Sequence, residues 1–253
     1  MPLQFTTPGE LAQVRAAGRL AWTIIQQLVP MVRPGVATVS IAQRAQQLIE
    51  ESGATPTTKG FVWTDDDAQP FPHAVSVCIN DEVMFGVPGE REIAPGDLVT
   101  LDVTLRTGLG WCADVATSIP VGPGGRSERL VAAGHAAVAS TLTHAQPGAW
   151  WSDVMAHTSA AVGALGLHLA PGPTGHGIGR SVHEDPWLFA SPAGSDVRLR
   201  PGMVLCVEPV VLERPDKTVP DGPWTVKTVH DVWSAFEERM IAITPGGPEL
   251  LTQ

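Results

Sequence analysis

A twelve-residue stretch, 175–186, places two histidines and two acidic residues among glycines. It reads Gly-His-Gly-Ile-Gly-Arg-Ser-Val-His-Glu-Asp-Pro. Glycines on both sides of His176 would let a ligand or another backbone segment approach its imidazole closely. His183 follows seven residues later, so an extended or turned segment can present both rings to one cleft. The alternative is a glycine-rich surface loop that contains histidines by chance, because short motifs often match without function.

Four acidic residues stand in or beside apolar segments that resemble strands: Asp102, Asp114, Glu208 and Glu238. Burying an ionised carboxylate without a partner costs several kcal/mol. Any one of these acids could instead form a salt bridge or face solvent from an edge strand, but basic residues nearby in the sequence are few. Together with His176, the four acids predict a pair of divalent cations, which carboxylates can bridge. One imidazole among oxygen ligands suits Co, Mn, Fe or Zn equally.

The elements that must position these groups can be predicted from periodicity and breakers. Thr7, Pro8 and Glu10 form a capping box with proline at the first helical position. Helical spacing then predicts helices over 7–29, 38–52, 127–145 and 152–165. β-branched and apolar runs predict strands over 74–79, 97–105, 111–121, 203–211, 224–232 and 237–244. The loop at 60–72 contains Asp65, Asp66 and Asp67, which we expect to form a solvated tip.

The order of these elements contains an internal repeat. Pro34-Gly35 and Pro147-Gly148 each precede a helix that ends at a glycine, Gly53 or Gly166, nineteen residues after the proline. Pro95-Gly96 and Pro201-Gly202 each precede a strand that ends in an acid, Asp102 or Glu208, seven residues after the proline. We therefore expect one domain over 1–253, made of two halves at about 7–122 and 126–247 that are related by a pseudo-twofold axis.

Composition narrows the class of protein. With 43% hydrophobic and 17% charged residues, the chain should fold around a substantial core. A net charge of −10 argues against nucleic acid as a partner and favours divalent cations. Cys78, Cys112 and Cys206 are widely spaced in apolar runs, which predicts reduced core thiols. No secretory signal pattern or membrane-spanning run is visible, so we expect a cytoplasmic protein without membrane contact.

Several segments, taken together, resemble the type I methionine aminopeptidases over nearly the whole chain. They are Leu-Asp-Val-Thr at 101–104, Gly-His-Gly-Ile-Gly at 175–179, His-Glu-Asp-Pro at 183–186, Pro-Gly-Met at 201–203, Val-Glu-Pro at 207–209, Trp-Thr-Val-Lys-Thr at 224–228 and the strand that follows Glu238. The resemblance implies an α+β pita-bread fold with antiparallel sheets covered by helices. It implies a monomer that removes the N-terminal methionine from peptides or nascent chains, with the ribosome as a candidate partner.

The resemblance also assigns residues. It implies a two-metal site formed by Asp102, Asp114, His176, Glu208 and Glu238, the same set that the charge argument reaches. In such enzymes a water or hydroxide between the metals attacks the first peptide bond. Glu208 would relay protons, and His183 would hydrogen-bond the scissile amide, although His183 could also be a structural histidine that caps a turn. The pocket for the first side chain would involve His183 together with Phe71, Phe85, Val182 and Trp224, each of which could equally be ordinary core.

One departure from the family bears directly on activity. The family has a histidine in a segment reading His-Gly-Ile/Val-Pro, and here Phe85 stands in that place. A phenyl ring cannot donate a hydrogen bond, and losing one positioned donor typically costs about 10²–10⁴-fold in rate. Smaller departures are a longer turn between Asp102 and Asp114, an inserted Pro223, and Arg239 where the family often has histidine.

Three interpretations follow from this departure. The first is a slower or retuned aminopeptidase, and the second is a pita-bread metalloenzyme with another substrate. The third is a non-catalytic binding protein that retains the fold. Five polar groups placed around a core are costly to keep without metal chemistry, so the sequence favours an enzyme and, as its reaction class, the first interpretation.

Overall fold

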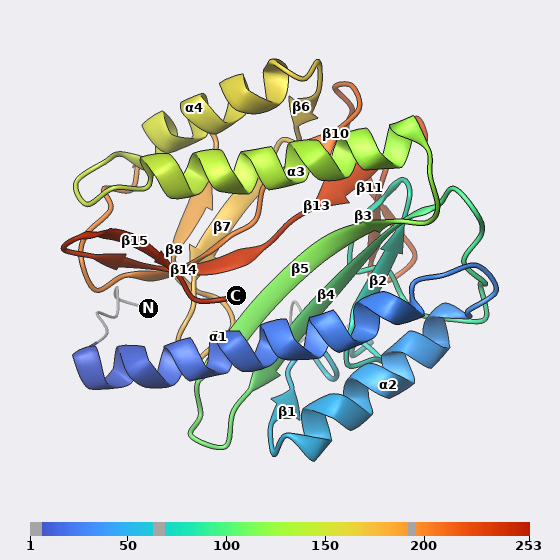
Figure 1. Cartoon of the computed structure of the whole chain (residues 1–253), viewed down its shortest axis with the longest axis horizontal. Helices are drawn as coiled ribbons and strands as arrows, with labels where there is room; N and C mark the ends of the chain where they lie inside the picture. The colour runs from blue at the N-terminus through green and yellow to red at the C-terminus, as the bar shows by residue number, and fades with distance from the viewer. Residues whose placement is uncertain (1–6, 63–68, 192–195) are drawn as a thin grey trace.

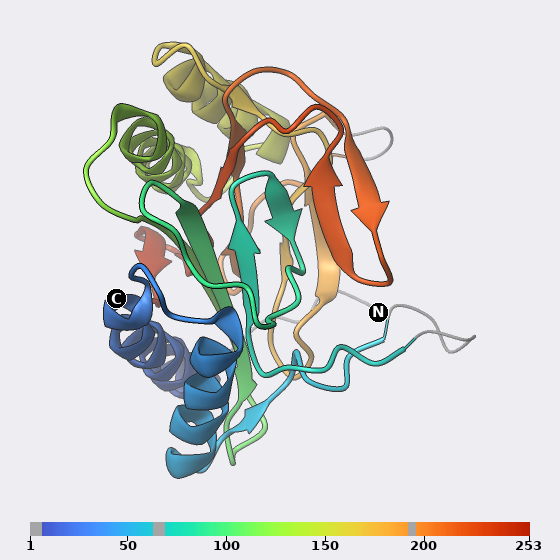
Figure 2. The same cartoon turned by 90° about the vertical axis from the view of Figure 1, so that its right-hand side faces the viewer.

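The helices lie together on one side of the molecule and the strands form the other side (Figures 1 and 2). The computed structural model describes residues 7–62, 69–191 and 196–253. Within these ranges the α-helices are α1 (Pro8–Leu28), α2 (Thr38–Glu51), α3 (Gly125–His144) and α4 (Trp151–Gly163), and a short 3-10 helix covers Val29–Met31. The predicted capping box is present, because the Thr7 side chain accepts from Glu10 N at 3.3 Å while Thr7 N donates to Glu10 Oε2 at 3.0 Å.

The described strands form four antiparallel sheets. The first contains β1 (Thr55–Pro56), β2 (Ser76–Ile79), β4 (Leu98–Arg106) and β5 (Cys112–Pro120). The largest has the order β15 (Gly247–Leu250), β14 (Arg239–Thr244), β9 (Val204–Val207), β7 (Pro173–Gly177) and β8 (Glu184–Phe189). The two smaller sheets are β13 (Ser234–Phe236), β10 (Val210–Leu212) and β6 (His168–Leu169), and β11 (Thr218–Asp221), β12 (Thr225–Thr228) and β3 (Glu82–Met84).

The α-helices pack on the sheets through shared hydrophobic cores. Helices α1 and α2 share a hydrophobic core with β2, β4 and β5, and α4 shares another with β9 and β14. The glycines of the sequence repeat adopt matching conformations. Gly53 and Gly166, after α2 and α4, have φ of 76° and 69°, while Gly96 and Gly202, before β4 and β9, have φ of 91° and 96°. Each helix pair therefore leads into a sheet through turns of the same kind.

A short bridge joins the two main sheets. Ala116 of β5 and Glu238, the residue before β14, form an isolated antiparallel bridge. Glu238 N donates to Ala116 O at 3.0 Å, and Ala116 N donates to Glu238 O at 3.3 Å. This bridge places the middle of β5 beside the start of β14.

Most predicted elements are present, with shorter strands in the second half. The strand predicted over 203–211 is divided into β9 and β10 at Glu208 and Pro209, because proline cannot donate to a strand ladder. The strand predicted over 224–232 covers only Thr225–Thr228. Asp65, Asp66 and Asp67 lie outside the described residues. All three cysteines are buried and unpaired, as expected. Among the described helices, none is both long and apolar enough to cross a bilayer.

Candidate metal centre

The five predicted metal ligands line a single pocket. Asp102 comes from β4 and Asp114 from β5, while His176 comes from β7. Glu208 directly follows β9, and Glu238 directly precedes β14. The side chains therefore come from both main sheets and converge near the bridge that joins them.

Strand register explains why the two aspartates share a face. Asp114 is the cross-strand partner of Thr104 in β4, and Asp102 lies two residues from Thr104. Because side chains two residues apart point to the same face of a strand, both carboxylates face the pocket.

Two glycines allow His176 to sit deep between strands. A Cβ atom at Gly175 would lie 2.3 Å from Cys206 O, and one at Gly177 would lie 2.3 Å from Asp185 O. Any side chain at either position would force β7 away from β9 or β8. The prediction that glycines let backbone pack closely around His176 is thus confirmed.

The carboxylates of the cluster lack the partners that buried charges require. Asp114, His176 and Glu238 are at most 4% exposed, whereas Asp102 and Glu208 are partly exposed toward the pocket. Asp102 Oδ1, Asp114 Oδ1 and Glu238 Oε1 are buried without a hydrogen-bond partner among the described residues. In the same part of the chain no lysine or arginine forms an ion pair with these acids, since Lys227 pairs with Asp221 and Arg239 with Glu237.

This environment shifts the pKa of every group in the cluster toward its neutral form. Burial raises the pKa of Asp102 to about 7, partly offset by a hydrogen bond with Asp114, and burial with the charge of Asp102 raises that of Glu208 to about 8. The pKa values of Asp114 and Glu238 rise through burial and neighbouring carboxylates. Burial, with a smaller effect of His183, lowers the pKa of His176 to about 4. Without a cation, the protein must hold extra protons here.

The two histidines of the motif lie side by side in the pocket. Their ring centroids are 4.6 Å apart with an edge-to-face arrangement. His176 Nδ1 lies 2.9 Å from Gly177 O, and Nε2 lies 3.9 Å from Glu238 Oε1. In the tautomer that carries its proton on Nδ1, Nε2 can bind a cation. His183 stacks on Trp187 at 5.4 Å, and burial lowers the pKa of His183, which keeps its imidazole neutral.

The pocket wall is aromatic, but its residues differ partly from those predicted. Val182, His183 and Phe85 line the pocket as expected. Phe71 and Trp224 instead lie behind Phe85, with ring centroids 6.2 Å and 5.9 Å from it. Trp224 Nε1 donates to Gln69 O, and its ring packs edge-on against Phe71. Residues that the sequence did not single out complete the wall: Thr57, Thr58, Phe61, Met84, Trp187 and Phe236.

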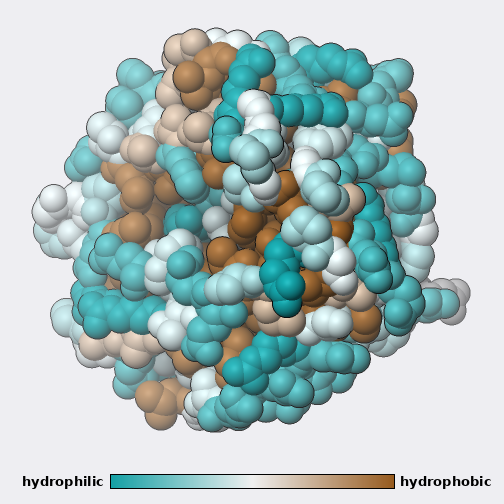
Figure 3. All heavy atoms as spheres, turned by 45° about the vertical axis from the view of Figure 1, so that its right-hand side comes forward, coloured by the Kyte–Doolittle hydropathy of each residue, from teal (hydrophilic) through white to brown (hydrophobic). Residues whose placement is uncertain are grey.

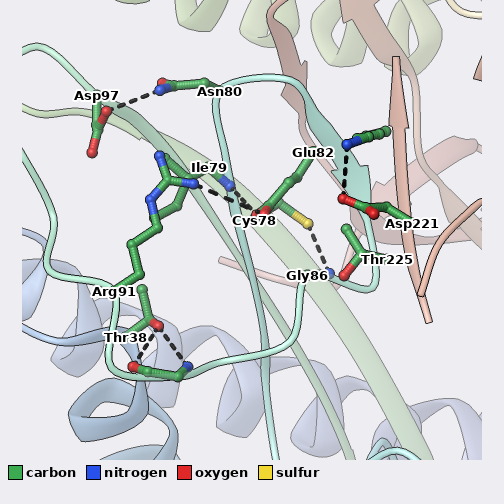
Figure 4. Close-up of polar contacts among 12 residues, drawn as sticks. Thr38, Cys78, Ile79, Asn80, Glu82, Gly86, Arg91, Asp97, Asp221 and Thr225 are labelled. Atoms are coloured by element: carbon green, nitrogen blue, oxygen red, sulfur yellow. Dashed lines mark hydrogen bonds and ion pairs between the residues drawn. The ribbon is translucent and has the colours of Figure 1, made fainter. Parts of the chain in front are cut away.

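Phe85 is held in place by its backbone. Its φ is 54°, which is unusual for a residue with a side chain. The following Gly86 N donates to Cys78 Sγ at 3.2 Å (Figure 4). Thr225 Oγ1 donates to Phe85 O at 3.3 Å. Further along this loop, Thr38 Oγ1 donates to Gly89 O at 3.0 Å (Figure 4). The Phe85 ring is therefore fixed against Phe61, with parallel rings 6.2 Å apart.

A second buried carboxylate adjoins the cluster and is fully paired. Glu237 accepts from Thr117 Oγ1, from Ser118 N at 2.9 Å and from Arg239 Nη2 at 2.9 Å. Arg239 Nη1 also donates to Ala116 O at 2.6 Å and to Glu238 O at 2.8 Å. In the sequence, Arg239 stood out as a departure from a family histidine and Glu237 was not singled out, although two adjacent glutamates before an apolar strand were a visible signal.

These observations fit a divalent cation better than any internal partner. Unpaired buried oxygens and an imidazole Nε2 form a donor set that such ions bind. Asp114, His176, Cys206 and Glu238 each offer one donor atom within 4.8 Å of the others. The surface view shows hydrophobic residues gathered around a hollow with a hydrophilic rim (Figure 3). Such a site can hold a cation below an apolar pocket.

Comparisons with known proteins agree with this architecture. The model of metallopeptidase family M24 matches residues 12–245. Methionine aminopeptidase 1 of Bacillus subtilis is 32% identical over 251 residues, which cover 98% of each chain. The crystal structure of methionine aminopeptidase from Rickettsia prowazekii has a TM-score of 0.91 at 27% identity and covers 99% of this chain and 100% of that one.

A more distant structure shares the fold alone. The Xaa-Pro dipeptidase from Bacillus anthracis has a TM-score of 0.76 at 23% identity, and the match covers 98% of this chain and 62% of that one. With the matches above, it confirms the predicted α+β pita-bread fold.

Proposed function

The chain belongs to metallopeptidase family M24, and we propose that it is a metal-dependent aminopeptidase of the type I methionine aminopeptidase kind. It would hydrolyse the first peptide bond of peptides or nascent proteins and release methionine. The observation that carries this proposal is the convergence of five donor side chains in one pocket with unpaired buried oxygens. We further propose a cytoplasmic monomer that meets its substrates as they leave the ribosome.

Asp102, Asp114, His176, Glu208 and Glu238 would hold two divalent ions, Co, Mn, Fe or Zn. Bound ions would polarise the scissile carbonyl and make water a nucleophile near neutral pH. Asp114 and Glu238 approach from opposite sheets, and each is buried with an unpaired oxygen that would be available to a cation. Asp102 and Glu208 face the pocket and complete the oxygen set.

Two residues would move or hold protons. Glu208 lies at the border of the cluster and the pocket, where its carboxylate can take a proton from water and deliver it to the leaving amine. His183 is neutral, lies beside His176 and faces the same pocket. Its imidazole can therefore hydrogen-bond the scissile amide, and Trp187 fixes the orientation of its ring by stacking.

The side chain of the first residue would enter the aromatic pocket. Phe61, Phe85 and Val182 supply apolar walls, and Phe71 and Trp224 support Phe85 from behind. Methionine suits such a surface, because its thioether contacts aromatic rings favourably.

Phe85 also supports a second candidate, a pita-bread peptidase that acts on another substrate. Its ring occupies the place of a family histidine, removes a hydrogen-bond donor and narrows the space beside Phe61. Under either candidate the donor cluster is used. A non-catalytic binding protein would have no use for these costly groups.

The test is a peptide panel assayed with metal-stripped protein that has been reloaded with Co, Mn, Fe or Zn separately. We expect Met-Ala-X to release free methionine only when metal is present, and we expect Asp114→Asn to lose this release. Cleavage restricted to peptides with proline in second position would favour the second candidate. A failure to bind any of the four metals would contradict both candidates.

The Phe85→His variant tests the proposed cost of the phenyl ring. If a donor is missing at this position, the histidine should raise kcat/KM for Met-Ala-X by at least about 10²-fold. Phe85→Leu is the matched control, since it also replaces the phenyl ring with a smaller side chain but adds no donor. Equal effects of the two changes would show that space, rather than hydrogen bonding, limits the reaction.

A further inference from the structure

The sulfur of Cys206 belongs to the same cluster as the candidate ligands. Cys206 lies on β9, two residues before Glu208, so both side chains point to the same face of the strand. It is the cross-strand partner of His176 on one side and of Met240 on the other. Its Sγ lies within 4.8 Å of a donor atom from each of Asp114, His176 and Glu238.

These distances come close to those between ligands of one ion. Metal–nitrogen and metal–sulfur bonds of about 2.0–2.3 Å keep two ligands of the same ion within about 4.6 Å of each other. All four residues are at most 4% exposed. Asp114 Oδ1 and Glu238 Oε1 have no hydrogen-bond partner in the described ranges, so these two oxygens also point to a missing cation beside the sulfur.

The other two cysteines have ordinary roles. Cys78 Sγ accepts a hydrogen bond from Gly86 N at 3.2 Å, and Cys112 Sγ donates to Arg180 O at 3.4 Å. Both thiols are thus used by the backbone, as buried cysteines often are. Cys206 instead faces an imidazole and two carboxylates.

We propose that Cys206 supplies a sulfur ligand to the cation held by Asp114, His176 and Glu238. The two metal positions then differ, because this one combines sulfur, nitrogen and oxygen, whereas Asp102 and Glu208 offer oxygen only. As the metal–sulfur bond forms, the thiol proton leaves to the solvent. The mixed position would prefer thiophilic ions such as Zn²⁺, Co²⁺ or Cd²⁺ over Mn²⁺. This inference rests on the proposed function only in that a divalent cation occupies the cluster.

The test is a titration of metal-stripped protein with Co²⁺, followed by absorption spectroscopy, in the wild type and in Cys206→Ser and Cys78→Ser. A sulfur-to-cobalt charge-transfer band should appear in the wild type and in Cys78→Ser and be lost in Cys206→Ser. Calorimetry should show Cd²⁺ affinity reduced at least about 10-fold in Cys206→Ser. Mn²⁺ affinity should change much less in the same variant.

Each outcome has a distinct meaning. Co²⁺ binding to the wild type without the band would overturn the sulfur ligand and leave the proposed function intact. No Co²⁺ binding to the wild type would overturn both. If Cys206→Ser does not fold, a band that survives in both Cys78→Ser and Cys112→Ser identifies Cys206, and a band lost in either variant contradicts it. Melting of the metal-free variants checks that packing is preserved.

Discussion

Glu237 and Glu238 are adjacent in sequence and equally buried, yet their surroundings are opposite. Glu237 is 0% exposed and accepts hydrogen bonds from Thr117, Ser118 and Arg239. Glu238 is 2% exposed, and its Oε1 has no hydrogen-bond partner in the described structure. Because neighbouring residues point to opposite sides of the chain, one carboxylate enters a complete network and the other enters the donor cluster.

The difference separates a structural carboxylate from one that is kept for a ligand. A buried charge with a full set of donors can hold a fold together, whereas a buried charge without them destabilises it. Glu238 is therefore expected to lower stability until a cation binds. Removing the charge of Glu238 should stabilise the metal-free protein, whereas disrupting the partners of Glu237 should destabilise it.

The largest effect is expected on activity from Glu238→Gln. The amide keeps the shape but removes a charged ligand, so turnover of a Met-Ala-X peptide should fall by at least about 10²-fold. The melting temperature of the metal-free protein should rise at pH 8, because repulsion among buried carboxylates decreases. Calorimetry and peptide release measure the two effects. A metal-free variant less stable than the wild type would contradict the assignment.

Arg239→Met should produce the largest loss of stability. It leaves Glu237 buried without its cation, which typically costs about 3–5 kcal/mol in free energy of unfolding. The double variant Glu237→Gln/Arg239→Met is the matched control and should recover part of this loss. Denaturant unfolding of the two single variants and the double variant gives the coupling directly. Additive effects would mean that the two side chains do not act as a pair.

The pH dependence of the metal-free protein should show the unsatisfied cluster. Burial raises the pKa of Asp102 to about 7 and that of Glu208 to about 8, so the folded form keeps protons that the unfolded chain has released. Their stabilising contribution is lost as pH rises through these values. The lowered pKa of His176 acts in the opposite sense, but only below its ordinary value of 6.5.

Between pH 6.5 and about 8, only the carboxylates among these groups change the stability of the metal-free protein with pH, and its melting temperature should fall. Thermal scans at several pH values measure this slope. The slope should be shallower in Glu238→Gln and should flatten or reverse with excess divalent ion, because the ion competes with protons for the ligands. A flat profile in the metal-free wild type would contradict the raised pKa values.

The smallest effect is expected from Thr117→Val. This change removes one donor of Glu237 without touching the cluster, and a hydrogen bond to a charged group contributes about 1.5–3 kcal/mol. Arg239 and Ser118 remain, so the loss should lie at the lower end of that range. Chemical unfolding gives the free energy, and metal affinity should stay as in the wild type. Weakened metal binding would show that the two carboxylates are not independent.

The parts of the site that could be predicted are those with chemical signals. Asp102, Asp114 and Glu208 stand out as acids in apolar strands, and His176 stands out through its glycines. The capping box at Thr7 and the paired Pro-Gly turns likewise follow from residue types with strong local preferences. These signals are local, so one sequence is enough to find them.

The parts that were missed depend on tertiary placement. Phe61 and Trp187 look like any core aromatic residue in the sequence. Only the packing of the segment after β1, which contains Phe61, and of β8, which contains Trp187, brings them into the pocket. Trp224 was predicted in the wall; its ring packs against Phe85 and Phe71, and its Nε1 donates to Gln69 O. Cys206 was interpreted as a core thiol, since its neighbours in sequence are apolar. Its neighbours in space come from three other strands or strand ends.

The bridge between Ala116 and Glu238 has a mechanical consequence. Asp114 and Glu238 lie on the two sheets that this bridge joins, so a cation bound by both residues would link the sheets. Without the cation, the sheets are held together by the bridge, the hydrogen bonds of Arg239 and the flanking hydrophobic core. We expect amides at 114–118 and 236–240 to exchange with deuterium faster in metal-stripped protein than in metal-loaded protein, because a bound cation would hold the two sheets together.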